Sequence, residues 1–253
     1  MKINNQLFKC LLVLLAFSNV VFAQQPEASK IAVSAPIKEW IAQLNDGDYS
    51  KRNAAVLALS SQPNDALPLL HEELKTETNS NKRWWLQVAI RECDEKRPKS
   101  GEISATPDNS KGLRPFESYK GGEGEFLVIE REDVRCWTVP KSASYLYLIA
   151  SDKFRQKVYA NLEIQVEFLD IGTSPISLEY NSTNLKAPFN GAYEMHPKHL
   201  HRTNSGQWRK SAFHLSEAHF RGAQNQNTDF RFYNGGEELI IRSVRVWPSN
   251  PED

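Results

Sequence analysis

The chain has 253 residues, of which 31 are lysine or arginine and 31 are aspartate or glutamate, so its formal net charge at pH 7 is zero. A chain of this length can form one large domain or two smaller ones, each with its own hydrophobic core. The balanced charge argues against nucleic acid and anionic membrane surfaces as the main partner, since both bind proteins through an excess of positive charge.

The first 23 residues have the pattern of a Sec-type signal peptide. Lys2 and Lys9 form a short basic start, an apolar run follows from Cys10 to Ala23, and Val21-Phe22-Ala23 supplies a cleavage site. The run is shorter than the ~20 residues that span a bilayer. The sequence therefore predicts cleavage after Ala23, a secreted or periplasmic protein and no membrane span. Residues 24–35 are expected to be a disordered N-terminal segment.

Residues 36–96 carry apolar side chains at helical spacing. We expect helices from Ile37 to Leu44, from Arg52 to Leu59, from Leu67 to Leu74, and a fourth that Asn81 caps. A shift of about 30 residues superimposes the second pair of helices on the first, and this period resembles short HEAT-like repeats. Two repeats rarely bury a core alone. This domain is therefore expected to be either a packing adaptor or a surface that binds an envelope protein partner.

Residues 97–112 are rich in Pro, Ser, Gly and charged residues, which is typical of a linker. Removal of the signal peptide leaves two of the three cysteines, Cys93 and Cys136. An even number of cysteines in an oxidising compartment favours one disulfide, which would connect the two halves of the chain. The alternative is two buried thiols.

From Phe126 onward the apolar residues recur with a period of two, most clearly from Leu162 to Phe168. Further strand-like runs are Phe126–Glu130, Tyr145–Ala150, Ile176–Tyr180, Gln207–Leu215, Thr228–Tyr233 and Leu239–Trp247. Many short strands between turn residues predict an antiparallel sandwich over residues 113–250. Strict alternation after Leu239 would turn Arg242 inward, so we expect a β-bulge there.

Six ordered motifs carry a family resemblance. They are YLYLIASD (145–152), EFLDIG (167–172), SLEYNS (177–182), QWRKSAFHL (207–215), AHFRGAQNQNTDFRF (218–232) and IIRSVRV (240–246). This set resembles the galactose-binding-like jelly-roll modules of secreted bacterial polysaccharide-degrading enzymes. The resemblance implies a carbohydrate-binding sandwich without catalytic machinery. The expected fold class is multidomain α plus β, with a small HEAT-like helical domain followed by a jelly-roll β-sandwich.

Sugar recognition needs aromatic rings for the C–H face of a sugar and planar polar side chains for its hydroxyls. Such residues concentrate between residues 185 and 208 and again near residue 226, and the candidates are Phe189, Asn190, Tyr193, Arg202, Trp208, Asn225 and Asn227. The favoured alternative is that Trp208 is a core residue and that Asn225 and Asn227 are turn residues.

Metal sites have weaker support. His196, His199 and His201 invite a zinc interpretation, but no further ligand completes the set. The family resemblance implies a structural calcium, for which the nearest carboxylates are Glu130 and Glu132, with Asp229 as a third. Calcium prefers oxygen ligands of this kind.

Catalytic motifs such as G-x-S-x-G, H-E-x-x-H and the P-loop are absent from the sequence. The leading hypothesis is a non-catalytic secreted protein that binds a polysaccharide or other glycan. One alternative is an envelope scaffold in which the helical repeats bind a protein partner and the sandwich is a spacer. A cryptic polysaccharide-active enzyme is the other.

Overall fold

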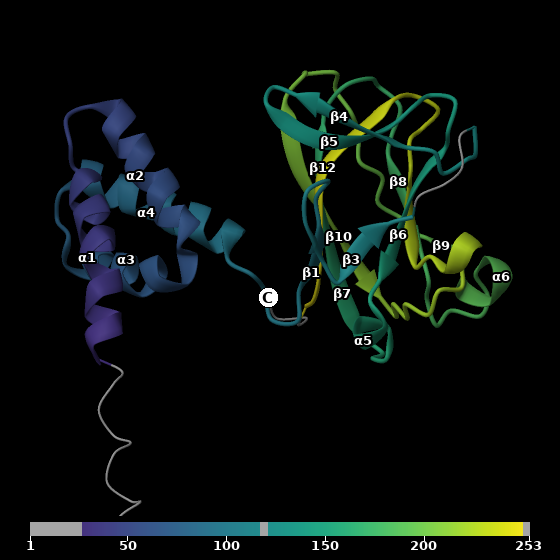
Figure 1. The fold of residues 1–253 in the computed structure, drawn as a ribbon, viewed down its shortest axis with the longest axis horizontal. Coiled ribbons are helices and arrows are strands. Elements are labelled where there is room, and N and C mark those ends of the chain that lie inside the picture. The colour runs from purple at the N-terminus through teal and green to yellow at the C-terminus, as the bar shows by residue number, and fades with distance from the viewer. Residues whose placement is uncertain (1–26, 117–120, 250–253) are drawn as a thin grey trace, which may run out of the picture. The chain divides into compact units, whose positions relative to one another are not determined.

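A computed structural model of the protein describes residues 27–116 and 121–249, with side chains described from residue 35 onward. The chain divides into two compact units, one ending at Arg97 and the other beginning at Pro98 (Figure 1). The predicted signal peptide lies outside the described residues, as do residues 24–26 of the predicted disordered segment.

The first unit contains four helices: α1 (Glu27–Gln43), α2 (Tyr49–Ser61), α3 (Pro63–Thr76) and α4 (Ser80–Lys96). Helix α1 begins at Glu27, so most of the segment predicted to be disordered is helical. Asp48 caps α2 by accepting a 2.8 Å hydrogen bond from the Ser50 amide. Asn79, and not Asn81, caps α4, because its side chain accepts from the amides of Asn81 and Lys82.

Apolar residues of all four helices form the core of this unit. Leu44, Leu59, Leu70 and Leu86 are fully buried in it. A HEAT repeat is not shown by this arrangement, and the repeat assignment and the protein-binding role of the unit stay predictions. None of the described helices is long and apolar enough to cross a membrane.

The second unit is a sandwich of two sheets whose named strands all pair antiparallel. One sheet has the order β10-β7-β12-β1-β2, with β5 also paired to β12 and β4 to β5, and the other has the order β3-β6-β11-β8-β9. The strands are β1 (Ile103–Ala105), β2 (Ser110–Lys111), β3 (Leu113–Pro115), β4 (Leu127–Arg131), β5 (Val134–Val139), β6 (Tyr145–Ala150), β7 (Asn161–Leu169), β8 (Ser177–Tyr180), β9 (Glu194–Met195), β10 (Trp208–Ser216), β11 (Phe230–Tyr233) and β12 (Leu239–Pro248). Short helices α5 (Asp152–Arg155) and α6 (Pro188–Gly191) and a 3₁₀ turn η1 (Asn225–Asn227) lie in the connections.

The core of the sandwich lies between the two sheets, as the alternating pattern predicts. Leu162 to Phe168 of β7 bury every second side chain, and Phe230 and Phe232 of β11 are fully buried on the facing sheet. The intervening residue of β11, Arg231, therefore lies on the outer face of the five-stranded sheet. This outer face carries the candidate site.

Two predictions about strand boundaries have different outcomes. The bulge is confirmed, since the register shifts between Ile241 and Ser243 and the Arg242 side chain is 42% exposed. The linker prediction is wrong for part of its length, because residues 97–112 contain β1 and β2. Strand β1 pairs with β12, with Ile103 opposite Val246. A three-residue strand is too short to show a period of two, which explains the error.

The predicted disulfide is also wrong. Cys93 and Cys136 are both free thiols, and both are buried. Cys93 packs in the helical core, and Cys136 packs against Leu169 and Ile240 in the sandwich, so each thiol belongs to the interior of its own unit. Burial raises the pKa of both thiols, that of Cys93 to about 11, which keeps them protonated and unreactive at neutral pH.

A reducing agent should therefore leave the thermal unfolding midpoint of the protein unchanged. Alkylation of the denatured, unreduced chain should modify both Cys93 and Cys136, because neither thiol is oxidised. Peptide masses after digestion report this directly. If the unfolding midpoint falls on reduction, and if Cys93 and Cys136 are not alkylated before reduction, the two cysteines form a disulfide.

Candidate functional site

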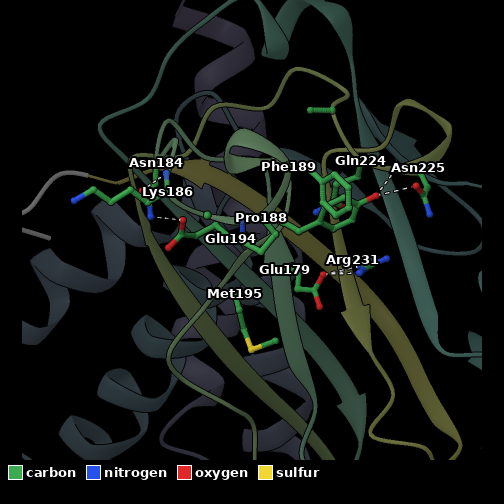
Figure 2. A pocket seen from close by; sticks show the side chains of 13 residues that line it. Glu179, Asn184, Lys186, Pro188, Phe189, Glu194, Met195, Gln224, Asn225 and Arg231 are labelled. Atoms are coloured by element: carbon green, nitrogen blue, oxygen red, sulfur yellow. Dashed lines mark hydrogen bonds and ion pairs between the residues drawn. The ribbon is translucent and has the colours of Figure 1, made fainter.

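A pocket of about 790 Å³ opens on the outer face of the five-stranded sheet (Figure 2). Strands β8 and β11 contribute Glu179 and Arg231, and the segment around α6 contributes Phe189 and Tyr193. Asn225 of the η1 turn lies beside Tyr193 on the same side of the pocket. The pocket thus combines an aromatic rim with charged and amide groups that come from strands.

Arg231 and Glu179 are cross-strand partners on this face. The Nε and Nη2 atoms of Arg231 donate to one Glu179 oxygen, Oε2, at 2.9 and 2.6 Å. The guanidinium carbon lies 3.7 Å from the ring centre of Tyr145 and 4.5 Å from that of Tyr193. Burial opposes the charge on Arg231, but the Glu179 carboxylate outweighs it and raises the pKa of the guanidinium. The ion pair is therefore a fixed part of the pocket.

A second hydrogen-bond chain fixes the aromatic wall. The Tyr193 hydroxyl donates to Asn225 Oδ1 at 2.9 Å and accepts from the Asn225 amide at 2.8 Å. Asn225 Nδ2 donates to Glu123 Oε1 at 2.9 Å, and the same oxygen accepts from the Tyr147 hydroxyl at 2.6 Å. Tyr147 in turn accepts from Arg231 Nη1 at 2.7 Å. The wall and the floor are thus one connected network, which holds the pocket in shape before any ligand binds.

The rim is formed by a strained loop. Phe189 is 81% exposed, and both Phe189 and Asn190 adopt left-handed backbone angles, with φ of 53° and 56°. Such conformations are costly for non-glycine residues and are concentrated at binding sites. Gly191 follows with φ of 86°, and a Cβ there would lie 2.6 Å from the Ser182 carbonyl oxygen. The Phe189 ring meets Tyr193 edge to face, with ring centres 5.5 Å apart.

Amide and carboxylate groups line the remaining walls. Glu194 Oε2 accepts from Asn184 Nδ2 at 2.7 Å and from Ser182 Oγ at 3.2 Å. Gln224 is buried and donates from Nε2 to the Ala192 carbonyl oxygen at 2.9 Å. Its Oε1 atom is buried and has no partner among the described residues.

Three of the seven predicted ligand-binding residues meet in this pocket: Phe189, Tyr193 and Asn225. Asn190 and Asn227 are exposed but do not line it. Their backbone carbonyls accept from arginines instead, Asn190 from Arg221 at 2.6 Å and Asn227 from Arg155 at 2.5 Å.

Arg202 and Trp208 are structural residues rather than parts of this pocket. The Arg202 side chain is fully buried and donates to three carbonyl oxygens, those of Ser174, Asn234 and Glu238, and to the Glu237 carboxylate. Trp208 packs with the cluster around Cys136, which agrees with the alternative of a core residue. Both were predicted to contact a sugar because planar polar groups and indoles look alike in a sequence whether they are buried or exposed.

Glu179, Glu194 and Arg231 were missed as candidates. A signal for two of them is present, since alternation in S-L-E-Y and F-R-F-Y turns Glu179 and Arg231 to the wet face of their strands. The alternation does not show that β8 and β11 are neighbours. Only this pairing places the two side chains together beneath the loop of Phe189.

The predicted calcium ligands do not converge. Asp229 is fully buried, and its oxygens accept from the amides of Ala150 and Gly222 and from Arg155. Glu130 and Glu132 are exposed, on β4 and in the turn after it. Over residues 35–116 and 121–249, no three His, Cys, Asp or Glu side chains form a group that could hold a metal. The three carboxylates therefore do not form one group among the described residues, and a structural calcium stays a prediction.

The histidines considered for zinc are also separate in their contacts. His196 is buried and contacts the His214 carbonyl oxygen at 2.9 Å, and His199 Nδ1 lies 2.8 Å from Ser177 Oγ. His201 is exposed. Hydrogen bonding accounts for the contacts of His196 and His199.

No family model matches the chain, and no curated protein matches it. Among solved structures, BiXyn10A CBM1 in its apo form is similar at 6% identity with a TM-score of 0.33, covering 58% of this chain and 96% of that one. The CBM22-1 xylan-binding domain of Xyn10C from Paenibacillus barcinonensis is similar at 12% identity with a TM-score of 0.33. The match covers 57% of this chain and 92% of that one. The K1 cleaved adhesin domain of Lys-gingipain from Porphyromonas gingivalis W83 is similar at 12% identity with a TM-score of 0.33. The match covers 59% of this chain and 99% of that one.

Proposed function

We propose that the sandwich is a non-catalytic carbohydrate-binding domain and that its ligand occupies the pocket beside Phe189. An aromatic ring can cover the apolar C–H face of a sugar, while planar polar side chains bind the hydroxyls at its edge. Phe189 and Tyr193 supply the rings. Asn184, Gln224 and Asn225 supply amide groups on the surrounding walls.

The exposure of Phe189 is the observation that carries this proposal. A phenylalanine that is 81% exposed gains almost nothing for folding, yet a left-handed backbone holds it at the mouth of a pocket that also carries charged and amide groups. Exposed apolar side chains within polar surroundings mark binding surfaces. Neighbouring Tyr193, anchored by Asn225, limits the freedom of the ring and so lowers the entropy cost of binding.

The ion pair of Glu179 favours a binding role over catalysis. Glycoside hydrolysis uses one carboxyl group as a proton donor and a second as a free carboxylate. Glu179 is instead the partner of Arg231, which donates two hydrogen bonds to its Oε2 atom. This pairing suits a carboxylate that holds the pocket in shape.

Phe189→Ala should weaken binding to the recognised polysaccharide by about tenfold, which corresponds to about 1.4 kcal/mol. The ring lies at the surface, so the free energy of unfolding should change by no more than about 0.5 kcal/mol. Affinity electrophoresis across a panel of polysaccharides measures the binding, and circular dichroism checks the fold.

Leu185→Ala is the matched control, because Leu185 is 73% exposed in the same loop and does not line the pocket. Its retardation in the gel should equal that of the wild type. Wild-type protein that no polysaccharide retards, or a Phe189→Ala variant that is retarded like wild type, would remove the basis for this site.

A further inference from the structure

The carboxylates of the pocket each present an oxygen that no described residue occupies. Glu179 receives both Arg231 donors on Oε2, and Glu194 receives Ser182 and Asn184 on its own Oε2. The Oε1 atom of each is therefore available as an acceptor within residues 35–116 and 121–249. Gln224 also lines the pocket, and its buried Oε1 has no partner in the same ranges.

Arg231, the cation between Glu179 and the tyrosine rings, is much less available than these acceptors, whereas Lys186 is exposed. The guanidinium of Arg231 donates to Glu179 and to the Tyr147 hydroxyl, and its faces lie against Tyr145 and Tyr193. An anion can reach it only by competing with Glu179. Figure 2 shows the Lys186 side chain extending outward at the Asn184 end, away from Arg231.

The formal charge of the lining is nevertheless balanced. Glu179 and Glu194 oppose Arg231 and Lys186, so no net field draws in a ligand of either sign. The available hydrogen-bonding capacity consists mainly of acceptors, which call for a ligand rich in donors. Hydroxyl groups on adjacent ring carbons meet this need, since a carboxylate binds them strongly and without a change of charge.

We propose that the pocket selects an uncharged sugar ring with several free hydroxyls and rejects rings that carry a carboxylate or sulfate. This rests on the proposed function, because it specifies the ligand of the same pocket. An acidic sugar would bring its charge close to Glu179 and Glu194, and like charges at an interface are strongly unfavourable.

The test uses oligosaccharide pairs that differ only at C6, where one member has a hydroxymethyl group and the other a carboxylate. Gluco-, manno- and galacto-configured pairs are immobilised on one array, with a glucosamine oligomer as a cationic probe. The full mature chain should bind the neutral member of at least one pair about tenfold more tightly than its acidic member. The glucosamine oligomer should bind no more tightly than its neutral counterpart.

The outcomes separate this inference from the proposed function. Tighter binding of an acidic member or of the glucosamine oligomer, lost in Phe189→Ala, would overturn the selectivity and keep the glycan site. Binding that Phe189→Ala leaves intact would overturn both the site and the selectivity assigned to it. A wild type that binds no probe and no polysaccharide would overturn the proposed function and this inference together.

Glu194→Gln tests the cause of the selectivity. The variant keeps one acceptor oxygen but loses the charge, so it should bind the neutral sugar about threefold less tightly and the acidic sugar about tenfold more tightly. Glu130→Gln is the control, because Glu130 is an exposed carboxylate on β4 of the other sheet. An unchanged preference in Glu194→Gln would contradict the proposed role of this charge.

Discussion

Replacing Asp229 by alanine should lower the free energy of unfolding of the sandwich by about 3–5 kcal/mol. The Asp229 side chain is fully buried and accepts hydrogen bonds from the Ala150 amide at 2.8 Å, the Gly222 amide at 2.8 Å and Arg155 Nε at 2.9 Å. Removal of the carboxylate leaves two amides and a guanidinium without their acceptor. Urea unfolding of the full chain, followed by circular dichroism, measures the change.

Asp152→Ala provides a close control for this prediction. Asp152 lies 3.9 Å from the same Arg155 guanidinium, but its side chain is 94% exposed. An exposed ion pair of this kind contributes little, so the expected loss is below about 0.5 kcal/mol. If the two variants lost the same free energy of unfolding, burial and the backbone donors would not be the reason that Asp229 stabilises the sandwich.

Asp170→Asn should destabilise the sandwich by about 3 kcal/mol at pH 7, and this difference should shrink in acid. Burial opposes the charge of Asp170, but hydrogen bonds from Thr203 and Ser205 outweigh it and hold the pKa of the carboxyl well below its usual value of 3.8. Both hydroxyls donate to Oδ2, at 2.6 and 2.7 Å. These contacts tie the loop before β10 to the end of β7.

The direction of the pH dependence follows from the lowered pKa. The stabilisation by Asp170 is complete above the pKa of the unfolded chain and is lost as the pH falls toward the pKa of the folded state. Below pH 3.8 the difference between wild type and Asp170→Asn should therefore narrow by about 1.4 kcal/mol per pH unit. Asp108→Asn is the control at a 57% exposed position paired with Arg135, and it should lower the free energy of unfolding at pH 7 by less than about 0.5 kcal/mol. A difference that stays constant down to pH 2.5 would refute this account.

The sheets could be predicted from the sequence where strands are long enough to show alternation. Strands β6, β7 and β12 were predicted to within one residue at each end, and the bulge beside Arg242 followed from the break in the pattern. Strand β1 was assigned to the linker, because Ile103 and Ala105 alone do not make a pattern. Its place is determined by pairing with β12, which only the folded chain reveals.

The candidate site was predicted in part for a similar reason. Phe189 and Tyr193 lie in a segment without regular periodicity, and this left them available for a ligand. Arg202 and Arg231 have the same chemistry in the sequence, yet loop carbonyls bury Arg202 while Tyr145 and Tyr193 hold Arg231 at the pocket. The difference depends on which loops and strands meet, and short-range patterns do not contain that information.

The pairing of β1 with β12 has an architectural consequence. These are the first and last strands of the sandwich, and their antiparallel alignment brings Ile103 opposite Val246, about 4.8 Å away in the hydrogen-bonding direction. A unit whose chain enters and leaves at one end can be inserted into a surface loop of a host protein with little distortion of that host. We therefore expect that the sandwich can be inserted into another chain and still fold.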